Sequence, residues 1–142
     1  HGITMKVLFH PPSGQTVQNP PLEFLHDLVV RPPIEYWNQG SGGATLDYLV
    51  GTKKTSLMLF PESELGLYLR YYDEDGNPWL SLRSEERLTE VVECNDEWYV
   101  STGLFLSNED AWKAVQEFLA TGRRSSDVRW ISASDIPEGG NW

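Results

Sequence analysis

The sequence predicts an α+β protein whose sheet is largely antiparallel. Helical patterns stand near the two ends of the chain, and several short extended patterns lie between them. Neighbouring strands in the middle of a chain pair as hairpins, which run antiparallel. A length of 142 residues fits one domain that buries a core without disulfides. We therefore expect one domain over residues 5–136, with an N-terminal helix and a C-terminal capped helix flanking the sheet.

The first third of the chain predicts a short strand, a loop and a helix. Residues 7–9 are apolar and fit an edge strand, whereas residues 10–21 contain four prolines and form a loop. Asn19 before Pro20 is typical of a helix start, with the proline as the first helical residue. The helix should end near Val30, because Pro32 disfavours helical geometry at the residue before it. Its apolar residues recur at helical spacing: Leu22, Leu25, Leu28 and Val29.

The middle of the chain reads as strands joined by turns. Residues 38–43 are a glycine-rich loop, after which residues 45–50 and 55–60 predict a hairpin with a connection over residues 51–54. Residues 65–71 alternate with a period of two, so their odd positions should face the core. Residues 73–78 have the composition of a turn. Further strands are expected at residues 79–82, 99–100, 104–106 and 128–132.

The clearest helix covers residues 108–121. Ser107 is a good N-cap, with Asp110 three residues later, and Gly122 is well placed to end the helix in a left-handed conformation. Residues 137–142 then look like a loose tail. The predicted core stripe of the helix consists of Ala111, Val115, Phe118 and Leu119, with Trp112 at its edge.

The ends of the chain and its single cysteine favour a cytoplasmic protein. Residues 1–4 precede Met5 and resemble a tag or cloning remnant, and the start lacks the pattern of a signal peptide. Cys94 has no second cysteine to pair with, which fits a reducing compartment. Its acidic neighbours should raise the pKa of the thiol, so a structural role is favoured.

The charge balance restricts the class of partner. Eleven Lys and Arg residues stand against 21 Asp and Glu residues, a formal net charge of −10. Such a chain lacks the basic footprint that nucleic acids require, and an anionic membrane surface would repel it. The balance favours a basic protein partner, or solubility alone.

The sequence completes none of three catalytic or metal-binding patterns. Asp73, Asp75 and Asn77 have the spacing of the first calcium ligands of an EF-hand, but its glycine and its final glutamate are missing. His10, His26 and Cys94 lack the spacing of a zinc site. No serine stands in a nucleophile elbow. We therefore expect no enzyme, no metal or other cofactor, and no small-molecule substrate.

What is left is an acidic stretch that also contains aromatic residues. Aromatic anchors inside a charged rim are common in tight protein interfaces. In the alternative interpretation the tryptophans belong to the core and the acids are merely solvated; we favour the core for Trp79 and leave Trp98 open. The candidate partner-binding residues are Asp73, Glu74, Asp75, Glu85, Glu86, Glu90, Glu93, Asp96, Glu97 and Trp98.

Three segments together resemble a known family. Residues 67–82 form a tyrosine-rich strand, an Asp/Gly turn and a strand; residues 105–124 form a strand and a capped helix ending in Thr-Gly-Arg-Arg; residues 128–131 close with Val-Arg-Trp-Ile. In this order they resemble the first-numbered immunity protein family of bacterial polymorphic toxin systems. The resemblance covers about residues 56–132 and leaves the N-terminal third unmatched.

The resemblance implies a non-catalytic antitoxin that binds and neutralises a secreted toxin encoded beside it. Members of that family are often paired with toxins of the nucleic-acid deaminase fold. A toxin that acts on DNA or RNA needs a basic substrate groove, which an acidic domain can block. Two alternatives stay open: a general acidic interaction domain without a toxin partner, and a small hydrolase that uses the Glu/Asp cluster.

Overall fold

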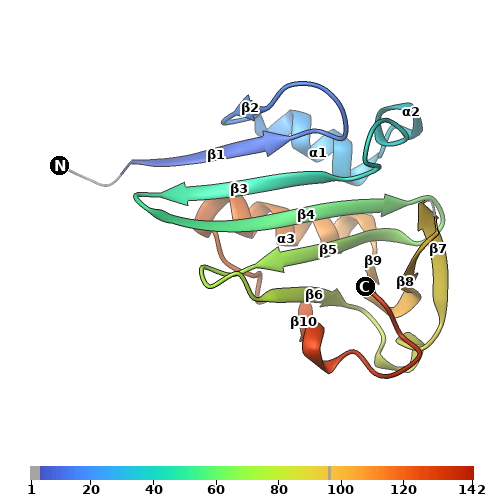
Figure 1. Ribbon diagram of the computed structural model, residues 1–142. Helices are drawn as coiled ribbons and strands as arrows, with labels where there is room; N and C mark the ends of the chain where they lie inside the picture. The colour runs from blue at the N-terminus through green and yellow to red at the C-terminus, as the bar shows by residue number, and fades with distance from the viewer. Residues whose placement is uncertain (1–3, 96) are drawn as a thin grey trace.

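The computed structural model describes residues 4–95 and 97–142 and has an α+β fold with a large antiparallel sheet (Figure 1). The helices are α1 (Leu22–Val30), α2 (Ile34–Trp37) and α3 (Asn108–Thr121), and short 3-10 turns are η1 (Glu85–Arg87), η2 (Thr102–Leu104) and η3 (Ala133–Asp135). The strands are β1 (Met5–His10), β2 (Val17–Gln18), β3 (Ala44–Val50), β4 (Lys53–Glu62), β5 (Gly66–Tyr72), β6 (Pro78–Leu82), β7 (Val91–Asn95), β8 (Trp98–Ser101), β9 (Phe105–Leu106) and β10 (Arg129–Ser132).

The main sheet is antiparallel throughout. Its strand order is β10-β6-β5-β4-β3-β1-β2, and β9 pairs with one end of β5. Strands β7 and β8 form a separate two-stranded sheet. Figure 1 shows α1 and α3 on one face of the main sheet, and the β7–β8 hairpin beside the end of the sheet where β5 begins.

The helix-covered face holds the larger core. The predicted alternation in β5 is confirmed, because Leu67, Leu69 and Tyr71 are buried in this cluster. From α3 the stripe is confirmed for Ala111, Val115 and Phe118, whereas Leu119 is only partly buried. Burial of such large apolar side chains is the main stabilising contribution to a fold of this size.

A second, smaller core lies against the opposite face of β5 and β6. Tyr68 and Leu80 leave the sheet on this side and are fully buried. They are covered by Val100 of β8, by Leu104 and by Phe105. The prediction that the odd positions of β5 face the core did not include Tyr68, because a strand covered on both faces buries both sets of side chains.

The C-terminal helix has the predicted caps. The Ser107 hydroxyl accepts a hydrogen bond from the backbone N–H of Asp110 at 3.2 Å. Gly122 ends the helix with φ at 71°, a left-handed conformation that glycine adopts without strain. The boundaries of α3 coincide with those predicted.

The predicted start of the first helix and the predicted length of the β3–β4 turn were both wrong. Helix α1 begins at Leu22, not Pro20: Asn19 takes φ of 49° and its side-chain oxygen accepts the Val7 N–H, which holds this segment against β1. The β3–β4 connection is also shorter than predicted, because pairing continues to Val50 and Lys53. Gly51 supplies the left-handed conformation that so tight a turn needs.

The C-terminal tail is not loose. Ser101 donates its backbone N–H to the Asn141 carbonyl at 2.9 Å, and Trp98 donates its indole N–H to the Trp142 carbonyl at 3.3 Å. The Pro/Gly composition of the tail indicated flexibility, but tertiary hydrogen bonds fix it. In the described part of the chain, no helix is long and apolar enough to cross a membrane.

Candidate functional site

The predicted acidic stretch does not form one surface. Residues 73–75 follow the end of β5, whereas Glu93 and Glu97 flank the β7–β8 turn, beside the start of β5. Seven residues of β5 separate the two ends, a distance of about 20 Å. Glu85, Glu86 and Glu90 lie around η1, and Asp96 lies outside the described residues. The candidate residues are therefore divided among three places.

The acids of the β5–β6 turn build the turn itself. The Asp73 carboxylate accepts backbone N–H groups from Asn77 at 2.9 Å and Asp75 at 3.0 Å, and the indole N–H of Trp79 at 3.3 Å. The hydrogen bond from Asn77 is the main reason that the pKa of Asp73 is lowered. Glu74 lies 4.0 Å from the Lys53 ammonium. These contacts give Asp73 and Glu74 partners within the chain.

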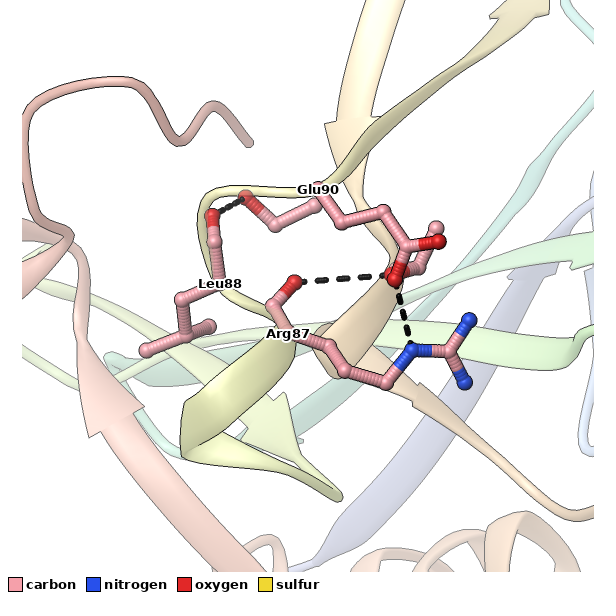
Figure 2. Close-up of polar contacts among 5 residues, drawn as sticks. Arg87, Leu88 and Glu90 are labelled. Carbon is pink, nitrogen blue, oxygen red and sulfur yellow. Dashed lines mark hydrogen bonds and ion pairs between the residues drawn. The ribbon is translucent and has the colours of Figure 1, made fainter.

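The acids around η1 also have internal partners. Figure 2 shows Arg87 and Glu90 in direct contact, with the guanidinium Nε 2.7 Å from the carboxylate. This hydrogen bond, together with one from the Thr102 hydroxyl at 3.0 Å, lowers the pKa of Glu90. Glu85 lies 3.6 Å from a guanidinium nitrogen of Arg129. Of this group, Glu86 is exposed and has no ion pair among the described residues.

The remaining candidates adjoin a groove at the end of the sheet. The groove has a volume of about 700 Å³ and lies between α2, the β4–β5 turn and the β7–β8 hairpin. We call it the end groove; its principal lining residues are Trp37, Phe60, Glu62, Glu64, Cys94 and Trp98. Of the predicted site residues that the structure describes, only Trp98 lines it, while Glu93 and Glu97 stand beside it on the hairpin.

Two glutamates of the β4–β5 turn set the electrostatics of the end groove. Partial burial raises the pKa of Glu62, and the nearby negative charge of Glu64 raises it further. Glu64 has φ of 90°, a conformation that costs a residue with a side chain about 1–2 kcal/mol. Arg83 is the only cation among the residues that line the groove in the described structure. The groove thus holds a partly buried carboxylate that a basic group would stabilise.

Cys94 shares this acidic environment. Burial raises the pKa of its thiol to about 11, with a smaller contribution from Glu62. The predicted direction of this shift is confirmed, but its source is burial together with Glu62 and not the acids next to Cys94 in the chain. A thiol with so high a pKa is a poor nucleophile near neutral pH.

An aromatic cluster around Arg70 holds the Trp98 wall of the groove. The Arg70 guanidinium carbon lies 4.8 Å from the centroid of the Trp142 ring, 5.3 Å from that of Phe60 and 5.8 Å from that of Trp98. The Phe60 and Trp98 rings meet edge to face at 4.9 Å. Trp98 is therefore both part of the second core and a wall of the groove, which answers the question that the sequence left open. Trp79 packs at the edge of the larger core, as expected.

The structure also reveals a polar chain on the open face of the sheet. His10 Nε2 lies 2.7 Å from Asp47, which accepts the Ser56 hydroxyl at 2.6 Å, and His10 Nδ1 lies 2.9 Å from the Thr16 hydroxyl. Ser56 bonds to the carboxylate rather than to the imidazole, so His10 is not placed to take its proton. The contacts fasten the loop after β1 to β3 and β4. Sequence spacing missed them, because His10 and Asp47 are 37 residues apart and meet only through strand pairing.

Comparisons with known proteins find no relative of this chain. Within the described residues, no group of three His, Cys, Asp or Glu side chains could hold a metal ion. No protein-family model, no curated protein and no solved structure matches the chain.

Proposed function

We propose that the chain is an immunity protein that binds a basic toxin domain through the end groove and blocks its active site. The observation that carries the proposal is the partly buried Glu62 carboxylate beside Glu64 in a groove lined by aromatic residues, in a chain of net charge −10. A Lys or Arg side chain that enters the groove would stabilise the ionised Glu62 carboxylate and so offset the cost of its partial burial. The aromatic rings Trp98 and Phe60 offer the same side chain a cation–π contact.

The remaining features of the proposal follow from its chemistry. The toxin acts on nucleic acid, as a deaminase does, so its substrate groove is basic and the acidic antitoxin competes with the substrate. Long-range attraction steers the encounter, with association reaching ~10⁸–10⁹ M⁻¹s⁻¹ at low salt. The antitoxin works in the bacterial cytoplasm, needs no cofactor and catalyses no reaction.

The alternative is a general acidic interaction domain with no toxin partner. Both functions would use the end groove, so the partner distinguishes them. Expression of the toxin domain encoded beside this gene, with and without the chain, tests the first function directly. Growth restored by the chain, together with a stable complex on gel filtration, supports an immunity protein, whereas unrelieved toxicity and no complex favour the alternative.

A charge-reversal pair tests the groove. Replacing Glu62 and Glu64 by lysine sets like charges against the toxin and should slow association by at least about tenfold at low salt. The matched control reverses Glu23 and Glu117, which lie on α1 and α3 at the ends far from the groove, and changes the net charge equally. Surface plasmon resonance at several salt concentrations measures both rates. Equal slowing in the two variants would mean that net charge alone acts and that the groove is not the docking site.

A further inference from the structure

The β7–β8 hairpin has one covered edge and one open edge. On the outer side of β8, Ser101 donates its backbone N–H to the Asn141 carbonyl at 2.9 Å, and the Asn141 side chain donates to the Tyr99 carbonyl at 2.6 Å. The C-terminal tail therefore occupies the backbone groups of Tyr99 and Ser101. No third strand continues the hairpin on the β7 side in the described part of the chain.

Antiparallel pairing shows which groups β7 leaves open. Successive residues of a strand point their N–H and C=O groups alternately to one neighbour and to the other. Tyr99 and Ser101 point away from β7, so their partners Glu93 and Val91 point away from β8. One residue further along, the Thr102 N–H donates to the Glu90 carbonyl at 2.7 Å, so this pair points inward, as the alternation requires. Val91 and Glu93 thus present two N–H and two C=O groups at the outer edge, where Figure 1 shows β7 at the margin of the molecule.

The side chains at this edge select the occupant. Val91 is 41% exposed and Tyr99 is 45% exposed, which gives an added strand an apolar surface to cover. Glu93 pairs directly with Tyr99 and lies two residues from Val91, and Glu62 is close enough to Cys94 to raise the pKa of its thiol. A second copy of this chain would bring Glu93 against acids of the same edge. A basic strand would meet Glu93 on the outward face of the hairpin and Glu62 of β4 in the groove beside it.

We propose that the open edge of β7 receives an extended, lysine- or arginine-bearing strand of the partner, which adds to the hairpin as a third antiparallel or parallel strand. Backbone hydrogen bonds to Val91 and Glu93 supply the docking, and the flanking acids select the charge. This inference rests on the proposed function, since it assigns the binding mode of the same partner at the rim of the end groove. In the competing interpretation, Glu93 only protects an exposed edge against aggregation.

Amide hydrogen exchange of the full chain with and without the toxin domain tests the edge. In the free protein the N–H groups of Val91 and Glu93 should exchange within the time expected for exposed amides, and the complex should protect both. A complex that forms while both amides stay unprotected overturns the strand addition and leaves the proposed function standing. Absence of any complex overturns the proposed function instead.

A synthetic probe separates the edge from the toxin. A short peptide of alternating valine and lysine should bind the full chain, and its glutamate-for-lysine counterpart should not. N-methylation of the residues whose N–H would face β7 removes two hydrogen bonds, so it should weaken binding by about tenfold. N-methylation at the alternate residues is the matched control and should change affinity little. Equal affinities of the two methylated peptides would overturn the proposal, because backbone bonding would then play no part.

A substitution in β7 tests the same edge in a second way. Val91→Pro removes one outward N–H, and an edge strand tolerates proline where its N–H faces solvent. Binding of the lysine peptide should fall, while Val91→Thr, which keeps the N–H, should bind like the wild type. Circular dichroism establishes that both variants are folded. Unchanged binding by folded Val91→Pro would contradict the proposal.

Discussion

The two faces of the main sheet are closed by different means. One face is covered by α1 and α3, which bring long apolar stripes onto Phe9, Leu57 and Leu69. The other is covered over β5 and β6 by a two-stranded hairpin, three single turns and the chain terminus. Both faces also carry side-chain hydrogen bonds and a cation against aromatic rings: Arg124 lies 3.8 Å from the centroid of the Trp79 ring on the helical face, and Arg70 lies 4.8 Å from that of Trp142 on the second. The two faces therefore differ in the segments that cover them, which are regular helices on one face and turns with the chain terminus on the other.

The difference shows where a binding surface can be built in a small domain. The helix-covered core is closed by two regular helices, which turn their apolar residues inward. The second core is assembled from turns, and turns leave Glu62, Glu64 and Trp98 at the rim of a groove. Connecting segments commonly carry function because a rigid scaffold positions them.

The largest effect is expected in the helical core. Phe118 is 1% exposed and contacts the Tyr48 and Tyr71 rings, so Phe118→Ala should lower the free energy of unfolding by about 3–5 kcal/mol. Urea denaturation measures the change. Leu22→Ala on α1 is the control: Leu22 is 50% exposed, and its truncation should cost less than about 1 kcal/mol. Equal losses in the two variants would show that the contrast between buried and exposed helix faces is wrong.

A smaller effect should separate the second face from the first. Trp142→Ala removes the ring that stacks on Arg70, and with part of its apolar contact it should cost about 1–2 kcal/mol. Because the tail holds β8, the amides of Val100 and Ser101 should exchange faster, while those of Leu57 and Leu69 change little. Faster exchange of all four amides by the same factor would mean that the two faces unfold together, and the comparison would fail.

The helix cap should contribute less again. Ser107→Ala removes the acceptor for the Asp110 N–H and should cost about 1 kcal/mol. Ser107→Asp restores an acceptor and should recover most of the loss, which thermal or urea denaturation measures. If aspartate fails to rescue, the serine acts through packing between β9 and α3 rather than through the cap.

Near neutral pH the smallest effect on stability concerns Cys94 in the second face, because its contribution changes only at high pH. Its thiol pKa is about 11 against 9.0 for an ordinary thiol, so the stabilisation linked to the neutral form is complete below pH 9 and is lost as the pH rises toward 11. Wild type should therefore lose more stability between pH 9 and 11 than Cys94→Ala does. At pH 8, iodoacetamide should modify the native thiol about 100-fold more slowly than a free cysteine. An alkylation midpoint near pH 9 would show that Cys94 is exposed.

Local pattern sufficed where neighbours in the chain decide the structure. Helix α3 was predicted with its limits and both caps, because Ser107 and Gly122 act through the backbone groups next to them. The turn at residues 73–78 was predicted for the same reason. The start of α1 was not, because Asn19 bonds across to Val7 instead of capping the helix.

The candidate site was predicted only in part. Composition indicated an acidic, aromatic surface, and Trp98 does line the end groove. That surface was predicted as one continuous stretch, but Asp73, Glu85 and Glu90 have partners inside the chain. Glu62 and Glu64 were missed, because nothing in their own segment indicates that it meets α2 and the β7–β8 hairpin.

The sequence by itself determined the α+β class, the capped helix, the faces of its alternating strand and an excess of negative charge. Those properties depend on residues within a few positions of one another and on totals over the chain. Only the tertiary structure decided which acids have partners in the chain, which tryptophans border the groove, and how the tail covers one edge of the β7–β8 hairpin. Each of these depends on contacts between segments far apart in the chain, such as Trp98 with Trp142 and Tyr99 with Asn141, and such contacts leave no periodic pattern in the sequence.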